Sequence, residues 1–258
     1  MNSVNELVVA PNSTVREVVA EDFRTAAIFQ KYGLDFCCGG GATIERSCQK
    51  KGVNADLLIA ELRGVMEGRS AEEPRFNQWS VDLLINYILQ NHHSYIRSVL
   101  PTILGHAEKV ARVHGGANPS LVEVAEKFRG IAEDMTSHIA KEERILFPYI
   151  QYLSQVDSAE KEIQAPSFGS VQNPIQMMEV EHQLAGDEME EMRRLTNNYT
   201  PPAEACTTYR VLFQELQEFE QDLHRHIHLE NNILFPKAIQ LEQSIQREDE
   251  VTRSESVV

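Results

Sequence analysis

Two eleven-residue segments of this sequence are nearly the same: HIAKEERILFP at residues 138–148 and HIHLENNILFP at residues 226–236, with seven identical positions. Each segment has a His followed four residues later by a Glu. On an α-helix this spacing places both side chains on one face, one turn apart, where an imidazole and a carboxylate can bind the same metal ion. The repeat therefore predicts metal binding.

The repeat extends toward the N-terminus, because His93 lies 45 residues before His138 and His182 lies 44 residues before His226. Nearly equal spacing indicates two copies of one helix pair that face each other around a pseudo-twofold axis. The alternative without a metal is an inherited duplication whose polar groups only hydrogen-bond to one another in the core. Burial of four imidazoles and two carboxylates without a metal is costly in free energy unless all of them are paired. Six candidate ligands follow: His93, His138, Glu142, His182, His226 and Glu230.

The number of candidate ligands suits two ions. Each ion takes two imidazoles, and the carboxylates bridge the pair at the roughly 3.5 to 4 Å typical of two-metal sites. Mixed imidazole and carboxylate ligands with open coordination positions favour iron, with manganese and zinc as competitors. Closed structural zinc sites usually use thiolates, and the sequence has no Cys-x-x-Cys pair.

Other polar residues near these positions have simpler explanations. His92, His224 and His228 lie one or two residues from a candidate ligand, so we expect them at the surface or behind the ligands. Glu143 and Glu181 are adjacent to candidate ligands; one explanation is that they accept hydrogen bonds from those ligands, but solvated charge is the favoured explanation. His114 shares a face with His93 but lies roughly 30 Å further along a continuous helix, so we expect it at a helix C-terminus, where the helix dipole favours it, with an accessory role as the minor alternative.

The pattern of apolar residues predicts an all-α protein. From residue 80 onward, four long amphipathic stretches with two short connections and one longer one indicate an antiparallel four-helix bundle. The N-terminal part predicts a helix from Thr14 to Phe29, two shorter helices, and a polar linker over residues 68–75. The long helices are expected at 80–113, 119–153, 172–198 and 203–241. The expected domains are a small helical domain at 1–72, the bundle at 78–242 and a frayed polar tail at 243–258.

Two adjacent cysteines, Cys37 and Cys38, stand in the segment DFCCGGG at residues 35–41, where three glycines predict a loop. A disulfide between neighbours is strained, and the pair is poorly placed to chelate a metal without other ligands. Two readings stay equally open: small buried residues in a turn, or redox or transfer thiols on an exposed loop.

Composition excludes several classes of function. The formal net charge of −15 argues against non-specific binding to nucleic acid and to anionic membranes. No apolar run approaches the roughly 20 residues of a spanning helix, and the first residues lack the pattern of a signal peptide. Four cysteines, two of them adjacent, suit a reducing compartment, so we expect a cytoplasmic protein.

The order of DFCCGGG, His93, the two His-x-x-x-Glu segments that end in LFP, and MEVEH ending at His182 resembles the iron–sulfur cluster repair di-iron proteins, also called repair of iron centres proteins. Their second domain is hemerythrin-like. The resemblance covers nearly the whole chain and implies a non-haem di-iron centre with carboxylate and oxo bridges at the six positions. Oxygen-carrying hemerythrins have a further His on the third helix, where this chain has Gly186, which counts against reversible oxygen carriage.

The resemblance implies repair of iron–sulfur clusters damaged by nitrosative or oxidative stress, by donation of iron, with Cys37 and Cys38 accepting, relaying or sensing. Damaged or apo iron–sulfur proteins would be partners, and nitric oxide or oxygen small ligands. Two alternatives stay open at this stage: a nitric oxide reductase, which would be an enzyme, and a gas or redox sensor. The sequence does not choose between a monomer and a homodimer.

Overall fold

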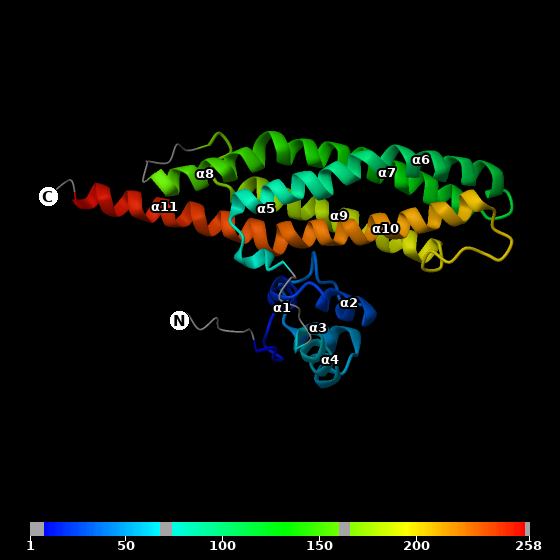
Figure 1. The fold of residues 1–258 in the computed structure, drawn as a ribbon, viewed down its shortest axis with the longest axis horizontal. Coiled ribbons are helices and arrows are strands. Elements are labelled where there is room, and N and C mark those ends of the chain that lie inside the picture. The colour runs from blue at the N-terminus through cyan, green and yellow to red at the C-terminus, as the bar shows by residue number, and fades with distance from the viewer. Residues whose placement is uncertain (1–7, 68–73, 160–165, 256–258) are drawn as a thin grey trace. The chain divides into compact units, whose positions relative to one another are not determined.

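The computed structural model describes residues 8–67, 74–159 and 166–255, and these residues form helices and no β-strand, which confirms the all-α class. They group into two compact units (Figure 1). The N-terminal unit is Met1–Ser80 together with Ile227–Pro236, and the bundle unit is Val81–His226 with Lys237–Val258. The segment Ile227–Pro236, expected within the second domain, thus packs with the first. Most of the predicted linker, residues 68–73, lies outside the described residues.

The helices of the N-terminal unit are short and enclose an apolar core. They are α1 (Val15–Glu21), α2 (Thr25–Lys31), α3 (Ile44–Lys51) and α4 (Ala55–Glu67), followed by the 3-10 turn η1 (Phe76–Gln78). Their apolar faces meet in fully buried side chains: Val15, Val18, Phe29, Ile44, Leu58 and Leu62.

The single helix predicted from Thr14 to Phe29 is wrong, because the structure has two helices there. The predicted capping box is present: the Thr14 hydroxyl accepts from the Glu17 backbone and the Glu17 carboxylate accepts from the Thr14 backbone. The break comes at Asp22, an extended residue whose carboxylate accepts hydrogen bonds from the backbone and the guanidinium of Arg24. An Asp can end a helix in this way because its short side chain bonds to nearby backbone N–H groups, which then do not need helical hydrogen bonds.

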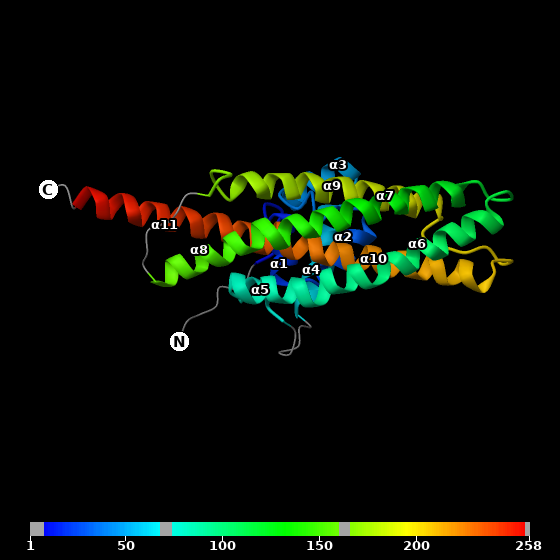
Figure 2. The same cartoon turned by 90° about the horizontal axis from the view of Figure 1, so that it is seen from above.

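The bundle consists of four long helical segments. They lie side by side (Figure 2). Three of them contain a π-helical turn, labelled η2, η3 or η4, between two α-helices. The connections after His114 and after Leu195 fall where the sequence predicts them. The elements are α5 (Val81–Tyr87), η2 (Ile88–His93) and α6 (Ser94–His114); α7 (Ser120–Lys141), η3 (Glu142–Leu146) and α8 (Phe147–Ala159); α9 (Gln172–Leu195); and α10 (Thr207–Leu229), η4 (Glu230–Leu234) and α11 (Phe235–Glu255).

The last helix is longer than predicted. We expected it to end near residue 241 and the tail to fray, but α11 continues to Glu255. The sequence from 243 to 255 contains neither Gly nor Pro, so nothing in it stops the helix. Residues 256–258 of the expected tail lie outside the described residues.

A buried carboxylate on α11 holds the start of α9. Glu242 is 3% exposed, and its carboxylate accepts hydrogen bonds from the Tyr149 hydroxyl at 2.9 Å, the Ser170 hydroxyl at 2.6 Å and the Val171 backbone at 3.0 Å. Val171 precedes the first residue of α9, where backbone N–H groups lack helical partners. Glu242 therefore satisfies a helix end and ties three helices of the bundle together.

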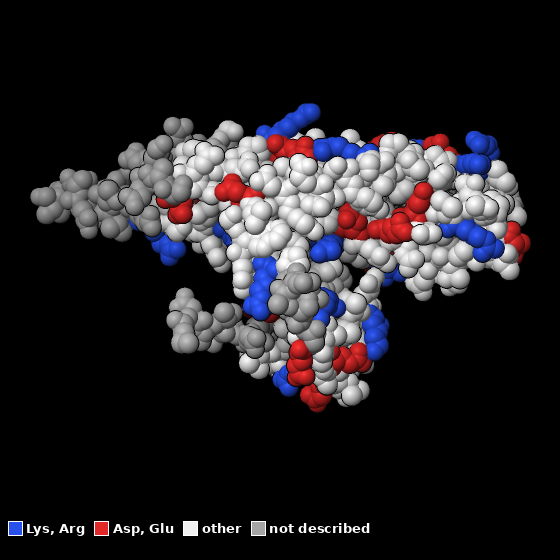
Figure 3. All heavy atoms as spheres, viewed as in Figure 1, with Lys and Arg blue, Asp and Glu red and all other residues white. Residues whose placement is uncertain are grey.

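Acidic side chains gather on the bundle surface over α10 (Figure 3). Burial and then the charges of Asp222, Glu218 and Glu215 raise the pKa of Tyr95 to about 12. The arrangement agrees with the negative net charge of the chain. Within the described residues, no helix has the length and apolarity that crossing a bilayer requires.

Candidate metal centre

The two repeated segments change helix type at their Glu. His138 and His226 lie on α-helices, whereas Glu142 and Glu230 open the π turns η3 and η4. The backbone N–H of Phe147 bonds to the carbonyl of Glu142, and that of Phe235 to the carbonyl of Glu230, which is the five-residue spacing of a π-helix.

The prolines that follow explain why both repeats widen at this point. Pro148 and Pro236 have no N–H to donate, and a proline ring in a regular α-helix clashes with the carbonyl four residues earlier. One extra residue in the preceding turn shifts those carbonyls and lets the helix continue. Each proline thus has a π turn on its N-terminal side.

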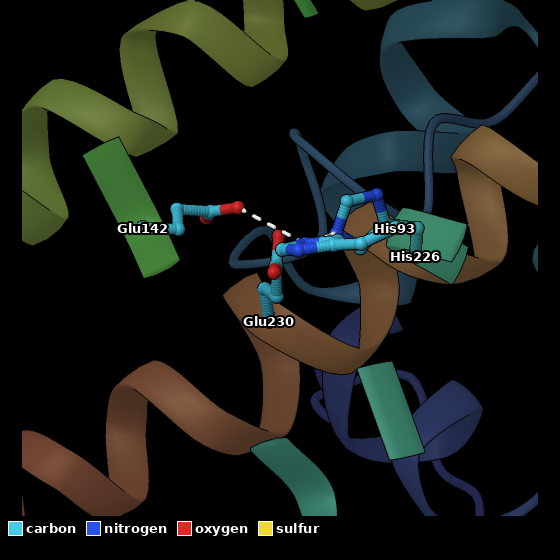
Figure 4. Close-up of side chains that lie close together, drawn as sticks. All are labelled: His93, Glu142, His226 and Glu230. Carbon is cyan, nitrogen blue, oxygen red and sulfur yellow. Dashed lines mark hydrogen bonds and ion pairs between the residues drawn. The ribbon is translucent and has the colours of Figure 1, made fainter. Parts of the chain in front are cut away.

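The six predicted ligands come together as two groups of four. One group is His93, Glu142, His226 and Glu230, and the other is His138, Glu142, His182 and Glu230. In each group the potential ligand atoms all lie within 4.8 Å of one another. Figure 4 shows the first group, with the carboxylates and imidazoles pointing toward one another. All six side chains are at most 1% exposed.

The imidazoles meet in pairs through the same ring nitrogen. Nε2 of His93 lies 3.2 Å from Nε2 of His226, and Nε2 of His182 lies 3.0 Å from Nε2 of His138. Glu142 spans the two pairs, because its Oε2 lies 3.3 Å from Nε2 of His93 and its Oε1 lies 3.4 Å from Nε2 of His138. Each oxygen of this carboxylate thus faces a different pair of imidazoles, as in a carboxylate that bridges two ions.

Two further carboxylates hold two of the imidazoles from behind. Nδ1 of His93 lies 2.8 Å from Glu143, which also pairs with Arg97 at 2.6 Å. Burial raises the pKa of Glu143, but hydrogen bonds from Arg97 and His93 outweigh burial and hold this pKa below its usual value. An ionised Glu143 accepts a hydrogen bond from the N–H at Nδ1 and so leaves the lone pair of Nε2 directed at the site, which is the form of His that binds metals.

Glu181 has the same role for the second pair of imidazoles. Its carboxylate lies 2.9 Å from Nδ1 of His138 and also accepts a hydrogen bond from Lys141. Burial raises the pKa of Glu181, and the hydrogen bonds from Lys141 and His138 lower it by more. Solvated charge, which we judged a sufficient explanation for Glu143 and Glu181, is therefore the wrong account of both.

Two of the three neighbouring histidines, His92 and His228, are buried rather than at the surface, whereas His224 is partly exposed. The ring of His92 is 3% exposed and stacks on that of His226, with centroids 5.6 Å apart, while its Nδ1 lies 2.9 Å from Asp222. His228 is 1% exposed and packs against Phe23. His92 therefore supports the plane of a candidate ligand, and His228 belongs to the packing of the N-terminal unit.

The cysteine loop is held by a carboxylate and by two asparagines. The Asp35 carboxylate accepts from the backbone N–H groups of Cys37, Cys38 and Gly39 at 2.9, 3.0 and 2.7 Å. Within the same unit, the Asn232 side chain donates to the carbonyl of Phe36 at 3.0 Å, and that of Asn231 donates to the carbonyl of Cys37 at 3.3 Å. All four cysteines of the chain are free thiols.

The sequence reading missed Asn231 and Asn232. They directly follow Glu230 and stand where the first copy of the repeat has Glu143 and Arg144. Every residue from His226 to Phe235 is buried, whereas Arg144 is exposed. In the second copy, asparagines replace the charged residues of the first copy. This difference was the signal in the sequence that the second copy is buried.

His114 ends α6, as predicted, and its Nε2 lies 3.3 Å from the sulfur of the exposed Cys206. The sequence contains no pattern that connects these two residues, which come from different helical hairpins.

The bundle is of the hemerythrin class. Residues 84–238 match the family model of the hemerythrin HHE cation binding domain, and residues 11–65 match a domain described as Domain of Unknown function (DUF542). The first match covers more than half of the chain, so this protein contains a hemerythrin domain that binds cations.

Relatives that cover both domains are more specific. The chain is 38% identical over 216 residues to the iron–sulfur cluster repair protein YtfE of Dickeya chrysanthemi, covering 84% of this chain and 91% of the relative. It is 39% identical over 219 residues to YtfE of Musicola paradisiaca and 38% identical over 218 residues to YtfE of Yersinia pseudotuberculosis, with the same coverage. The chain belongs to this family of iron–sulfur cluster repair proteins, and the resemblance inferred from the motifs is confirmed.

Proposed function

We propose that the six clustered side chains hold two iron ions, one between His93 and His226 and the other between His138 and His182, with Glu142 and Glu230 shared by both. The observation that carries the proposal is that two buried four-donor groups have the same two carboxylates in common. Two imidazoles and two carboxylates per ion are a donor set that suits iron and leaves coordination positions open.

The protein surroundings fit such a centre. Two carboxylates buried in the middle of a bundle cost several kcal/mol each in lost hydration, and bound cations offset that cost. The paired Nε2 atoms each have a lone pair directed at the space between them when Nδ1 carries the proton. The four imidazoles and two carboxylates therefore have the charge and the orientation that two cations require.

We propose repair of iron–sulfur clusters damaged by nitrosative or oxidative stress as the function, with damaged or apo iron–sulfur proteins as partners. The relatives that carry the same two domains are named for this repair. Bound iron would supply an exchangeable ferrous ion to the partner. The four free thiols suit a reducing compartment, and we place the activity in the cytoplasm.

Residues of this chain determine how tightly the ions are held. Glu143 and Glu181 fix the imidazoles of His93 and His138, and the ring of Phe147 stacks on His93 with centroids 5.6 Å apart. A surface cavity of about 490 Å³ is lined by Arg97, Glu143 and Phe147 among others. The cavity therefore borders Glu143, the group that orients His93.

The test is to purify the protein without oxygen, count iron per chain, and follow transfer of ferrous iron to an apo iron–sulfur protein. We expect two irons per chain, a loss of both irons and of transfer in the double variant Glu142→Ala, Glu230→Ala, and no loss in Glu133→Ala. Glu133 is an exposed residue of α7, the helix that precedes Glu142, and serves as the matched control.

Two results would overturn the proposal. Fewer than about one iron per chain, unchanged in the double variant, would refute the di-iron centre. Turnover of nitric oxide to nitrous oxide by a preparation that never releases iron to the acceptor would refute donation and favour a reductase.

A further inference from the structure

Three potential metal ligands converge in the cysteine loop, apart from the histidines and glutamates of the bundle. Ligand atoms of Asp35, Cys37 and Cys38 all lie within 4.8 Å of one another. The sulfurs of Cys37 and Cys38 are 3.7 Å apart, and the sulfur of Cys37 lies 3.4 Å from Oδ1 of Asp35. Two adjacent cysteines chelate a metal ion poorly without other ligands, and Asp35 is such an additional potential ligand.

These separations match those of ligands around one tetrahedral ion. Sulfurs at about 2.3 Å from a zinc-like ion are held about 3.8 Å apart, and a carboxylate oxygen at about 2.1 Å lies about 3.6 Å from each sulfur. The observed 3.7 and 3.4 Å differ from these values by only 0.1 to 0.2 Å. With the ligand atoms of all three residues within 4.8 Å of one another, the two sulfurs and the carboxylate are close enough to share one ion.

The loop keeps this arrangement through its backbone. The N–H groups of Cys37 and Cys38 point at Oδ1 of Asp35 and that of Gly39 points at Oδ2, so of the roughly four lone-pair sites of this carboxylate the one left for a metal is on Oδ2. The carbonyl of Cys37 is bound by Asn231 and that of Phe36 by Asn232. At Gly40 an added Cβ would lie 2.8 Å from the carbonyl oxygen of Phe36 and 3.3 Å from Oδ1 of Asn232, so the loop closes only with glycine there.

We propose that Asp35, Cys37 and Cys38 form a second, exchangeable site for a divalent transition-metal ion. Binding replaces the two thiol protons: one M²⁺ enters, two sulfur–metal bonds form, two H⁺ leave, and no electron is transferred. Three protein ligands leave the fourth tetrahedral position for a donor of another molecule. Only the identity of the ion rests on the proposed repair function. In a repair protein, the ion is ferrous iron on its way to a damaged or apo iron–sulfur protein, the client.

The exposure of the three groups agrees with this role. Cys37 is buried, Cys38 is half-buried and Asp35 is exposed, so a client can approach the site from one side.

The test is anaerobic titration of the reduced, full-length apoprotein with Co²⁺. Sulfur-to-cobalt charge-transfer absorption reports thiolate ligands and is silent for a site made only of His and Glu. We expect this band in the wild type, its loss in Cys37→Ser and in Cys38→Ser, and at least about tenfold weaker binding in Asp35→Asn. The band should persist in Cys48→Ser and Cys206→Ser, which remove the other two thiols.

A second measurement needs no variant and covers the case in which a serine variant does not fold. In the wild type, bound Co²⁺ should slow alkylation of Cys38 at least tenfold and leave the exposed Cys206 unaffected. Absence of the charge-transfer band, its survival in Cys37→Ser, or equal alkylation with and without metal would each overturn the proposal. The double variant Glu142→Ala, Glu230→Ala should keep the band, so failure of this site and failure of the di-iron proposal are separate results.

Discussion

Removal of the Glu143 carboxylate should weaken metal binding mainly at the group that contains His93, and removal of Glu181 should weaken it mainly at the group that contains His138. Each carboxylate is bonded to Nδ1 of one imidazole, at 2.8 and 2.9 Å. The variants Glu143→Ala and Glu181→Ala leave these imidazoles free to rotate and to move their proton to Nε2. Both effects reduce the lone-pair density directed at the metal.

The size of the effect follows from the bond and its exposure. A hydrogen bond to a charged group is worth about 1.5 to 3 kcal/mol. Both carboxylates are 26% exposed, so solvent screening places the loss in the lower part of this range. A loss of about 1.5 to 2 kcal/mol corresponds to roughly 13-fold to 30-fold weaker binding at the affected ion. Glu143→Gln keeps an acceptor oxygen for Nδ1 and should cost about threefold or less.

The assay is a competitive anaerobic titration of the apoprotein with ferrous iron against a chelator, fitted with two binding steps. Glu143→Ala and Glu181→Ala should each weaken one binding step and leave the affinity of the other step within about threefold of the wild type. The double variant Glu143→Ala, Glu181→Ala should weaken both steps. Glu133→Ala serves again as the surface control. If Glu143→Ala weakens both steps equally, or neither, the assignment of one carboxylate to each imidazole pair is refuted.

Three further outcomes follow from contacts described above. Glu242→Ala should lower the free energy of unfolding in urea by about 3 kcal/mol, because several buried donors lose their acceptor; an effect below about 1 kcal/mol contradicts this account. Gly40→Ala should destabilise the N-terminal unit by about 1 to 3 kcal/mol through overpacking, whereas Gly41→Ala, whose nearest neighbour atom is 3.6 Å away, should change stability by less than about 0.5 kcal/mol. Tyr95 should ionise near pH 12 in a spectrophotometric titration, and Glu218→Gln should lower that pKa. Because the folded pKa of Tyr95 is raised above its ordinary 10.0, its contribution to stability is complete below pH 10 and is lost as the pH rises toward 12.

The sequence predicts the bundle and the clustering of the six side chains well, because both depend on local periodicity. His138 with Glu142 and His226 with Glu230 are one turn apart, and each pair begins before its π turn, so the ordinary helical period describes it correctly. Spacing between the copies then places His93 and His182 opposite them.

Features that depend on tertiary packing were harder to predict. The first predicted helix is split at Asp22 because the Asp22 side chain bonds to the backbone N–H of Arg24 in place of a helical hydrogen bond. The spacing of apolar residues does not reveal such a bond. Glu143 and Glu181 are charged and partly exposed, so their sequence context resembles that of solvated residues. The asparagines that hold the cysteine loop act on backbone carbonyls nearly 200 positions away in the chain, which no local pattern encodes.

The π turns at the two glutamates make the spacing of the repeated segments unusually intolerant of deletion. A π turn contains one residue more than the α-helical turn it replaces, and one residue corresponds to about 100° of rotation around the helix axis. Deletion of a single residue between Glu230 and Leu234 would remove the extra residue and turn all of α11 by that angle, swinging Glu242 away from the start of α9. The widened turn therefore sets the rotational register of everything that follows it, and natural variation in chain length should avoid these two places and collect in the connections between the helices.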